Sequence, residues 1–330
     1  MIVKPLKVPL HLLKYEALLR RLPEHHPRYR DVQQDDAKYT AGHRGEDALT
    51  YHYDRLPDKD FYRLHDLRLP LSKHFFQLDT LILTPRFAAI LEVKNFAGTL
   101  IFDHVFNQLI RRHNGREEAF EDPLLQVAEQ KEMLTRWLRL QGFPQDYPIK
   151  PLVVISHANT VIKASDNHPT ARNTIIHANF LPKKLHDYWT AHPRHILSDS
   201  HIHSLSQTLL QNHTPQNPDL LDRYNIKPSD LITGIQCASC TRFAMARKRG
   251  SWVCTSCSST DRLAHLPAVR DFALLIGPSV RNRELRQFLQ LTSPKVTSNL
   301  LNALHLPTQG KNKSYRYTLA HPSGIPLITP

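Results

Sequence analysis

The sequence predicts an α/β protein with two smaller modules toward its C-terminus. Three observations lead to this prediction. Short alternating or β-branched apolar runs are interspersed with amphipathic helical segments over roughly the first 190 residues. All four cysteines then occur as two CxxC pairs. Two short helical patterns, a basic turn and an alternating strand follow near the end of the chain.

The composition limits the classes of protein to which the chain can belong. A chain of 330 residues with 41% hydrophobic residues has room for more than one globular domain. The longest apolar run, residues 78–93, is interrupted by charges and a proline, and the N-terminal segment has prolines where a signal peptide needs an apolar core. We therefore expect no membrane partner and a cytoplasmic location, while the oligomeric state stays open.

Residues 75–98, FFQLDTLILTPRFAAILEVKNFAG, predict a β-hairpin. Two runs with a period of two enclose a Thr-Pro-Arg turn. Both faces of the first run are largely apolar, which indicates a strand in the middle of a sheet. An ionised carboxylate at Asp79 would be destabilising by several kcal/mol there unless a cation or hydrogen bonds compensate it.

The second run of the hairpin adds two further charges. Glu92 and Lys94 are two residues apart and therefore point to the same side of the sheet. Mg²⁺, or Mn²⁺ in its place, held by Asp79 and Glu92 would account for both carboxylates, and Lys94 would then position the attacking water. The alternative is a buried salt bridge with no catalytic role.

Polar residues on both sides of the hairpin favour the metal site. Glu46 shares a helical stripe with apolar residues and is expected to point inward. Asp122 caps a second helix whose first residue is Pro123, and Gln126 and Gln130 lie one turn apart on it.

The set GxxGE, D-x₁₂-ExK and a helix that begins DPLLQ resembles the NERD family, the nuclease-related domain of the PD-(D/E)XK nuclease superfamily. The resemblance covers roughly residues 38–190. It implies a central mixed sheet flanked by helices and a Mg²⁺-dependent phosphodiesterase site. The residue roles that it implies are metal ligation by Asp79 and Glu92, water positioning by Lys94, and accessory polar contacts by Glu46 and Gln126.

One departure from that family pattern stands beside the central aspartate. A polar residue is expected just before Asp79, and Leu78 occupies that position. The acidic pair is intact, but one possible supporting hydrogen bond is lost.

Other elements follow in chain order. Residues 11–22 predict a helix that packs on the nuclease-like core, and residues 31–36 predict a loop. The remaining predicted elements are strands at 61–67, 99–102, 107–112, 151–156 and 174–177, the second and third continuing the central sheet, and helices at 122–140 and 200–211.

The cysteines predict a zinc ribbon. Two CxxC pairs separated by 13 residues have the spacing of a tetrahedral Zn²⁺ site, and four thiolates leave no open position for a substrate, so the metal is expected to be structural. Disulfides are the alternative, which a cytoplasmic location disfavours. The four expected ligands are Cys237, Cys240, Cys254 and Cys257.

The C-terminal segment predicts a winged helix-turn-helix-like module. Helices at 281–289 and 295–304 are followed by a basic turn and a strand at 315–319. A small helical domain that binds protein is the alternative. The expected DNA contacts are Lys295, Thr297, Ser298 and Asn299 in the major groove, and Lys311 and Lys313 on phosphates.

The positive charge is concentrated in the same region. Residues 237–330 contain 13 Lys and Arg against 3 Asp and Glu, whereas residues 1–236 contain 30 against 27. Such a surface favours a polyanion, with DNA expected and RNA possible, and a merely solubilising surface is the alternative.

These observations predict a Mg²⁺-dependent nuclease that hydrolyses DNA. The alternative is a noncatalytic DNA-binding or regulatory protein that retains a nuclease-like fold. The predicted domains are an N-terminal helical extension (1–40), the nuclease-like domain (41–192), a linker (193–233), the zinc ribbon (234–262) and the winged-helix-like module (263–330).

Overall fold

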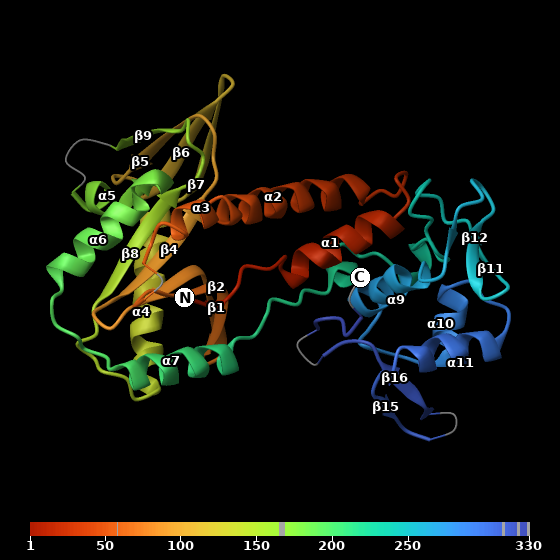
Figure 1. Ribbon diagram of the computed structural model, residues 1–330. Helices are drawn as coiled ribbons and strands as arrows, with labels where there is room; N and C mark the ends of the chain where they lie inside the picture. Colours follow the sequence, from red (N-terminus) through yellow and green to blue (C-terminus); the bar gives the residue numbers. More distant parts are fainter. Residues whose placement is uncertain (58, 165–168, 312–313, 322–323, 329–330) are drawn as a thin grey trace. The chain divides into compact units, whose positions relative to one another are not determined.

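The computed structural model describes residues 1–57, 59–164, 169–311, 314–321 and 324–328. It contains two compact units (Figure 1). The first unit comprises Met1–Lys7 and Tyr39–Thr214, and the second comprises Val8–Lys38 and Pro215–Pro330. The chain therefore passes from one unit to the other three times, after Lys7, Lys38 and Thr214.

A six-stranded mixed sheet forms the centre of the first unit and confirms the α/β prediction. The predicted hairpin is present as two adjacent antiparallel strands in its middle, so the Asp79 strand is paired on both sides. The strand order is β1 (Ile2–Lys4), β2 (Tyr62–Leu71), β3 (His74–Leu83), β4 (Ala88–Lys94), β8 (Ile149–Ile155) and β10 (Ile175–His177). The pairs β1/β2, β4/β8 and β8/β10 are parallel.

Helices cover both faces of this sheet. On one face, α4 (Pro123–Leu140) and α7 (Asp199–Asn212) share a core with the strands. On the other, α3 (Thr50–Tyr53) and α6 (Leu181–Ala191) do so. As predicted, Asp122 caps α4, where its carboxylate accepts the backbone N–H of Leu124 at 2.9 Å. Two short helices, α5 (Pro169–Thr174) and η1 (Ala178–Phe180), flank β10.

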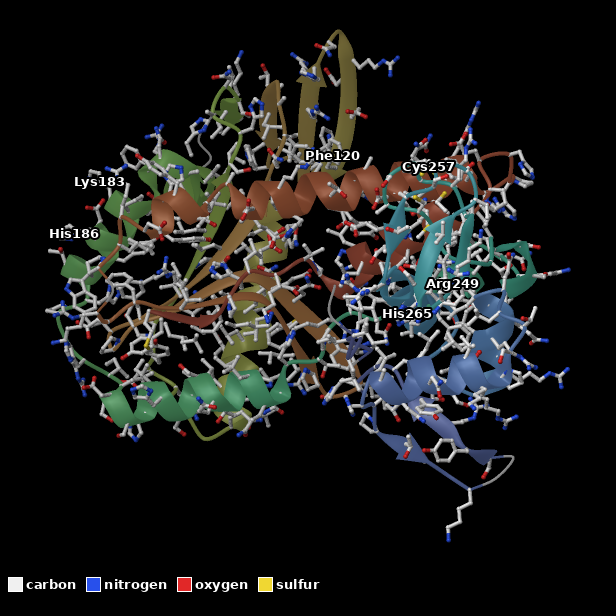
Figure 2. The ribbon with its side chains drawn as sticks, turned by 45° about the vertical axis from the view of Figure 1, so that its right-hand side comes forward. Phe120, Lys183, His186, Arg249, Cys257 and His265 are labelled. Carbon is white, nitrogen blue, oxygen red and sulfur yellow. The ribbon has the colours of Figure 1, made fainter. Side chains whose placement is uncertain are left out.

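The strands after Gly98 do not continue the central sheet, and that prediction was wrong. Both edges of β4 are already paired, with β3 and with β8, so no edge is open to them. They form a separate sheet of order β7-β6-β5-β9, in which Phe120 of β7 packs against Phe96 with ring centroids 4.8 Å apart (Figure 2). The bounds are β5 (Thr99–Asp103), β6 (Gln108–His113), β7 (Arg116–Glu121) and β9 (Val161–Ala164).

Residues 31–36 are helical, which corrects the predicted loop. They lie within α2 (Tyr29–Asp47), which begins in the second unit and ends in the first. Val32 and Gly45 are the buried residues of this helix. A helix that is polar on nearly all sides is mostly exposed, and that polarity was misinterpreted as a loop.

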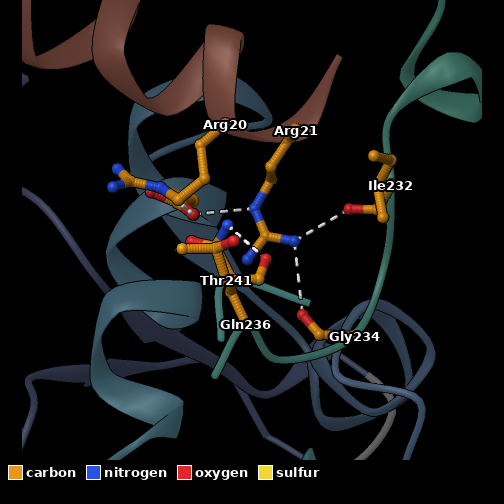
Figure 3. A network of polar contacts seen from close by, with 7 residues as sticks. Arg20, Arg21, Ile232, Gly234, Gln236 and Thr241 are labelled. Atoms are coloured by element: carbon orange, nitrogen blue, oxygen red, sulfur yellow. Dashed lines mark hydrogen bonds and ion pairs between the residues drawn. The ribbon is translucent and has the colours of Figure 1, made fainter. Parts of the chain in front are cut away.

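Helix α1 (Leu10–Arg21) belongs to the second unit, whereas it was expected to pack on the nuclease-like core. Its partner there is α9 (His265–Leu275). Arg21 is buried, and its Nε donates to Asp271 at 2.8 Å (Figure 3). Its Nη1 donates to the backbone carbonyls of Ile232 at 2.8 Å and Gly234 at 3.3 Å. Both an ion pair and backbone contacts therefore hold α1 in this unit.

One hydrophobic core joins the cysteine-containing segment to the C-terminal elements. Trp252 and Ile235 lie in the same cluster as Leu285, Leu301 and Tyr317. The first sheet of this unit has the order β11 (Met245–Lys248), β12 (Ser251–Cys254), β13 (Thr260–Asp261). The C-terminal part contains α10 (Asn282–Phe288), α11 (Pro294–Ala303) and a sheet of order β14 (Ser279–Val280), β16 (Arg316–Thr318), β15 (Thr308–Gln309), and the unit also includes α8 (Leu220–Arg223) and η2 (Pro228–Asp230).

Candidate functional site

The central hairpin opens at the position where the acidic residues lie. Strands β3 and β4 pair from Leu83 and Ala88 to Thr80 and Leu91, and Asp79 and Glu92 would be next in that register. Instead, Oδ2 of Asp79 accepts the backbone N–H of Val93 at 2.8 Å. The carboxylate thus takes the place of a strand carbonyl as acceptor. Its Oδ1 accepts no hydrogen bond from the part of the chain that the structure describes.

Lys94 joins the hairpin to helix α4. Its Nζ donates to Oε1 of Glu92 at 2.6 Å and to Oε1 of Gln126 at 2.9 Å. The other oxygen of Glu92 accepts Nε2 of Gln130 at 2.8 Å. Glu92 is only 3% exposed, so a lysine and an amide compensate its buried charge. The structure therefore brings together Glu92, Lys94 and Gln126, and the one-turn spacing on α4 adds Gln130.

Negative charge exceeds positive charge at this point. Burial and the charge of Glu92 raise the pKa of Asp79 to about 8. Burial and the charge of Asp79 raise the pKa of Glu46 to about 9. Both shifts mean that the folded protein disfavours the ionised carboxylates unless a cation neutralises them. Asp79 and Glu92 supply oxygen donors of the type that Mg²⁺ and Mn²⁺ prefer.

Gly45 explains how Glu46 reaches this region. A methyl group at Gly45 would lie 2.5 Å from Cβ of Asn95, which directly follows β4. The Asn95 amide in turn donates to the carbonyl of Ala41 at 2.8 Å. The end of α2 thus approaches the hairpin closely because residue 45 lacks a side chain. Gly42 has open space around it, so the same reason does not apply there.

Asp66 is an acidic residue near this site that the sequence prediction missed. His65 pairs with Thr80 and Leu67 with Leu78, so Asp66 falls opposite Asp79, and its φ of 47° lies in the left-handed region. Its charge contributes to the raised pKa of both Asp79 and Glu46. An aspartate inside an alternating apolar strand was the available signal.

Two residues hold Asp66 in this conformation. Nε2 of Gln77 donates to Oδ1 of Asp66 at 2.9 Å. Nζ of Lys4 donates to the carbonyls of His65 at 2.7 Å and Asp66 at 2.9 Å. Lys4 thus donates to two consecutive backbone carbonyls at the distorted position of the strand. Lys4 lies in the three-residue strand β1, which is too short for its sequence pattern to have predicted this role.

The four cysteines form a compact cluster of thiols. Their sulfur atoms all lie within 4.8 Å of one another, and no disulfide joins them. Sγ of Cys237 is 3.7 Å from Sγ of Cys257, and Sγ of Cys240 is 3.6 Å from Sγ of Cys254. Four sulfurs at about 2.3 Å from a central Zn²⁺ would be about 3.8 Å apart, so the cluster suits a structural metal. Among the described residues, no other group of three or more potential ligands gathers this closely.

The predicted nucleic-acid contacts differ in exposure. Lys295 and Asn299 are exposed on α11, and Lys311 is exposed after β15. Ser298 is partly buried and accepts the Asn282 amide at 2.8 Å. Thr297 is fully buried and its hydroxyl donates to the Ser293 carbonyl at 3.2 Å, so its predicted contact with DNA is wrong. Lys313 lies outside the described residues.

Comparison with protein-family models gives a match over part of the chain. Residues 41–156 match the NERD family, described as a nuclease-related domain. No curated protein and no solved structure is significantly similar to the chain. The matched residues include Glu46, Asp79, Glu92, Lys94 and Gln126. Separately, none of the helices in the described ranges is both long and apolar enough to cross a membrane.

Proposed function

Residues 41–156 form a nuclease-related domain of the NERD family, and from this premise we propose that the protein is a metal-dependent nuclease that hydrolyses phosphodiester bonds of DNA. The observation that carries the proposal is the convergence of Asp79, Glu92 and Lys94 where the central hairpin opens. Excess carboxylate charge at that point is a feature of cation sites as well as of strained scaffolds.

Asp79 and Glu92 would hold the cation, Mg²⁺ or Mn²⁺. Such a cation, when bound, stabilises charge on the scissile phosphate and lowers the pKa of a bound water. Lys94 has three N–H donors, of which two reach Glu92 and Gln126, so the third can orient the attacking water. Gln130 fixes the other Glu92 oxygen, and Gln126 keeps the lysine directed toward the site.

The second unit would supply affinity for the duplex. Its cysteine cluster would hold Zn²⁺ and stabilise the ribbon. The element order α9, β14, α10, α11, β15, β16, with β16 between β14 and β15, supports a winged helix-turn-helix interpretation. Lys295 and Asn299 on α11 then remain candidates for groove contacts, and Lys311 for a phosphate contact.

A noncatalytic DNA-binding protein is the second candidate. The 2.6 Å contact between Lys94 and Glu92 favours it, because a purely structural ion pair has the same geometry. The two candidates differ in one measurable property, which is metal-dependent turnover.

The test uses the full-length protein with supercoiled, linear and single-stranded DNA and with RNA. Each substrate is incubated with Mg²⁺, with Mn²⁺ or with no added divalent cation. We expect cleavage of DNA only with the cation, and a loss of about 100-fold or more in Asp79→Asn, Glu92→Gln and Lys94→Ala. Lys183→Ala is the matched control, because it loses an exposed pair with Asp187 and a contact with the exposed Phe180 ring, both outside the proposed site.

Two outcomes would contradict the proposal. Binding of DNA without any metal-dependent cleavage would favour the noncatalytic candidate. Cleavage by Asp79→Asn at the wild-type rate would mean that the activity uses a different site. Preferential cleavage of RNA would correct the substrate class.

A further inference from the structure

The tip of the ribbon hairpin has an unusual residue at a tight turn. Lys248 pairs with Ser251, so Arg249 and Gly250 alone connect β11 to β12. Both residues have positive φ, 45° at Arg249 and 83° at Gly250. A two-residue connection with positive φ at both positions is a type I′ turn, which prefers Asn, Asp or Gly first and Gly second.

Arg249 does not suit this position conformationally. Its Cβ disfavours the left-handed region, and Asn or Asp tolerates that region better through local hydrogen bonding. The second position carries the preferred glycine, so the deviation is confined to the arginine. A residue held in an unfavourable backbone region is an indication of function rather than of stability.

The arginine is also available to a partner. Lys248 and Arg249 are both exposed, and neither has an ion pair within the described ranges. Figure 2 labels Arg249. Directly before them, Arg247 lies over the Trp252 ring, 5.0 Å from its centroid, which anchors the strand beneath the turn.

Neighbouring acidic groups do not neutralise this charge. Residues 237–330 contain three acids, of which Asp271 and Glu284 pair with arginines other than Arg249. Asp271 pairs with Arg21 at 2.8 Å, Glu284 with Arg316 at 3.5 Å, and Asp261 accepts the backbone N–H of Leu263 at 2.7 Å. Within the described ranges none of these acids forms an ion pair with Lys248 or Arg249, so the two cations remain available to attract a polyanion.

We propose that the turn of residues 248–250 is a contact site for the phosphate backbone of nucleic acid, with Arg249 as its principal donor. A guanidinium presents a planar fork of N–H groups that matches two phosphate oxygens, and such contacts position a duplex without reading its sequence. The choice of nucleic acid over other polyanions rests on the proposed function, because the same chain carries the nuclease-related domain.

The test measures binding and stability on the same variants. All are made in full-length Asp79→Asn protein, without Mg²⁺ and without chelator, so that zinc is retained and cleavage does not interfere. Affinity for a fluorescent duplex is measured by anisotropy over a range of salt concentrations. Thermal unfolding is measured in the same buffer.

Arg249→Asn separates a binding role from a structural one. We expect its affinity to fall by roughly fivefold or more and its log–log salt slope to decrease by about 1. Its melting temperature should stay the same or rise, because asparagine suits the turn. Arg249→Lys should retain most of the affinity, and Arg139→Gln, an exposed cation of the first unit, should change neither quantity.

Three outcomes would overturn the proposal. Unchanged affinity and salt slope in Arg249→Asn would remove the contact. A lower affinity accompanied by a lower melting temperature would make Arg249 a structural residue. Arg249-dependent binding to anionic lipid vesicles, with DNA affinity unaffected, would assign the turn to a membrane surface.

The outcome is independent of the nuclease proposal. If the protein with Asp79 restored cleaves no substrate but Arg249→Asn weakens binding, the turn is supported and the nuclease proposal fails. If the protein with Asp79 restored cleaves DNA and Arg249→Asn binds normally, the nuclease proposal is supported and the proposal for the turn fails.

Discussion

Asp79 and Glu92 are adjacent carboxylates with different partners. Asp79 accepts a backbone N–H, and its raised pKa of about 8 means that it is largely protonated at neutral pH without a cation. Glu92 accepts from Lys94 and Gln130 and is almost fully buried. Substitution by the corresponding amide should therefore affect the two residues differently.

We predict opposite effects on stability in the absence of divalent cations. Asp79→Asn should leave the free energy of unfolding unchanged or raise it, since the amide resembles the protonated acid. Glu92→Gln should lower it by about 1 to 3 kcal/mol, less than for a fully buried pair because the Lys94 side chain keeps 22% of its exposure. Urea unfolding of both variants measures the difference. Equal losses would indicate a structural ion network instead of a cation site.

Three elements behind the site meet at one buried hydrogen-bond network. The Tyr53 hydroxyl of α3 donates to the Thr80 hydroxyl of β3 at 3.1 Å. The Thr80 oxygen is 3.0 Å from Nδ1 of His65 on β2. All three side chains are buried, and burial together with Arg63 lowers the pKa of His65 to about 4. A neutral Nδ1 can accept the Thr80 proton, whereas a protonated one cannot.

This network predicts a loss of stability in acid. In the unfolded chain His65 binds a proton below about pH 6.5, while in the folded protein it does so only below about pH 4. Between these values the unfolded state binds more protons, so stability falls as pH falls, by at most about 3 kcal/mol from this residue. His65→Asn should show a shallower decline over that window, and exposed His186→Gln should match the wild type. A wild-type decline in His65→Asn would assign the effect to other groups.

Local periodicity predicted the individual elements well. It predicted less well how these elements assemble. The hairpin, the cap at Asp122 and the charges at Asp79, Glu92 and Lys94 were evident because charged residues stand out in apolar strands. The strands after Gly98 were assigned to the wrong sheet, since periodicity does not show which strand edges are free. The positive φ of Asp66 has no signature in the sequence, because only glycine marks such a position reliably.

Assembly at the scale of the molecule was the least predictable. Helix α7 was assigned to a linker, but its apolar residues cover the central sheet. Residues 8–38 were considered an extension, but Arg21 pairs with Asp271, 250 residues away. Contacts over such separations leave no local pattern, so the predicted domain limits could not include them.

The shared core of the second unit changes the expected effect of removing the zinc proposed at the cysteine cluster. From the sequence alone, the zinc ribbon (234–262) was predicted to be a domain separate from residues 263–330, so that only the ribbon would depend on the metal. Because Trp252 and Ile235 pack with Leu285 and Leu301, we predict that Cys240→Ser or zinc chelation destabilises the whole second unit. Zinc binding at such sites contributes on the order of 10 kcal/mol or more, well above the core energy of a small domain.

Hydrogen exchange followed by mass spectrometry checks this prediction. Exchange should rise in α9 and α11 as well as in residues 237–261, while β3, β4 and α4 keep their protection. Ser256→Ala, inside the other CxxC pair (Cys254 and Cys257), is the control and should exchange like the wild type. Increased exchange confined to residues 237–261 would restore the narrower expectation.

The pairing of α1 with α9 also affects the protein during its synthesis. Arg21 leaves the ribosome 250 residues before Asp271. At about 5 to 20 residues per second, the interval is roughly 12 to 50 seconds. Throughout it α1, whose Leu12, Tyr15 and Leu18 are buried in the folded protein, lacks helix α9, against which it packs. The nascent chain thus presents a hydrophobic helix to chaperones for most of its translation, and the second unit can fold only near the end of it.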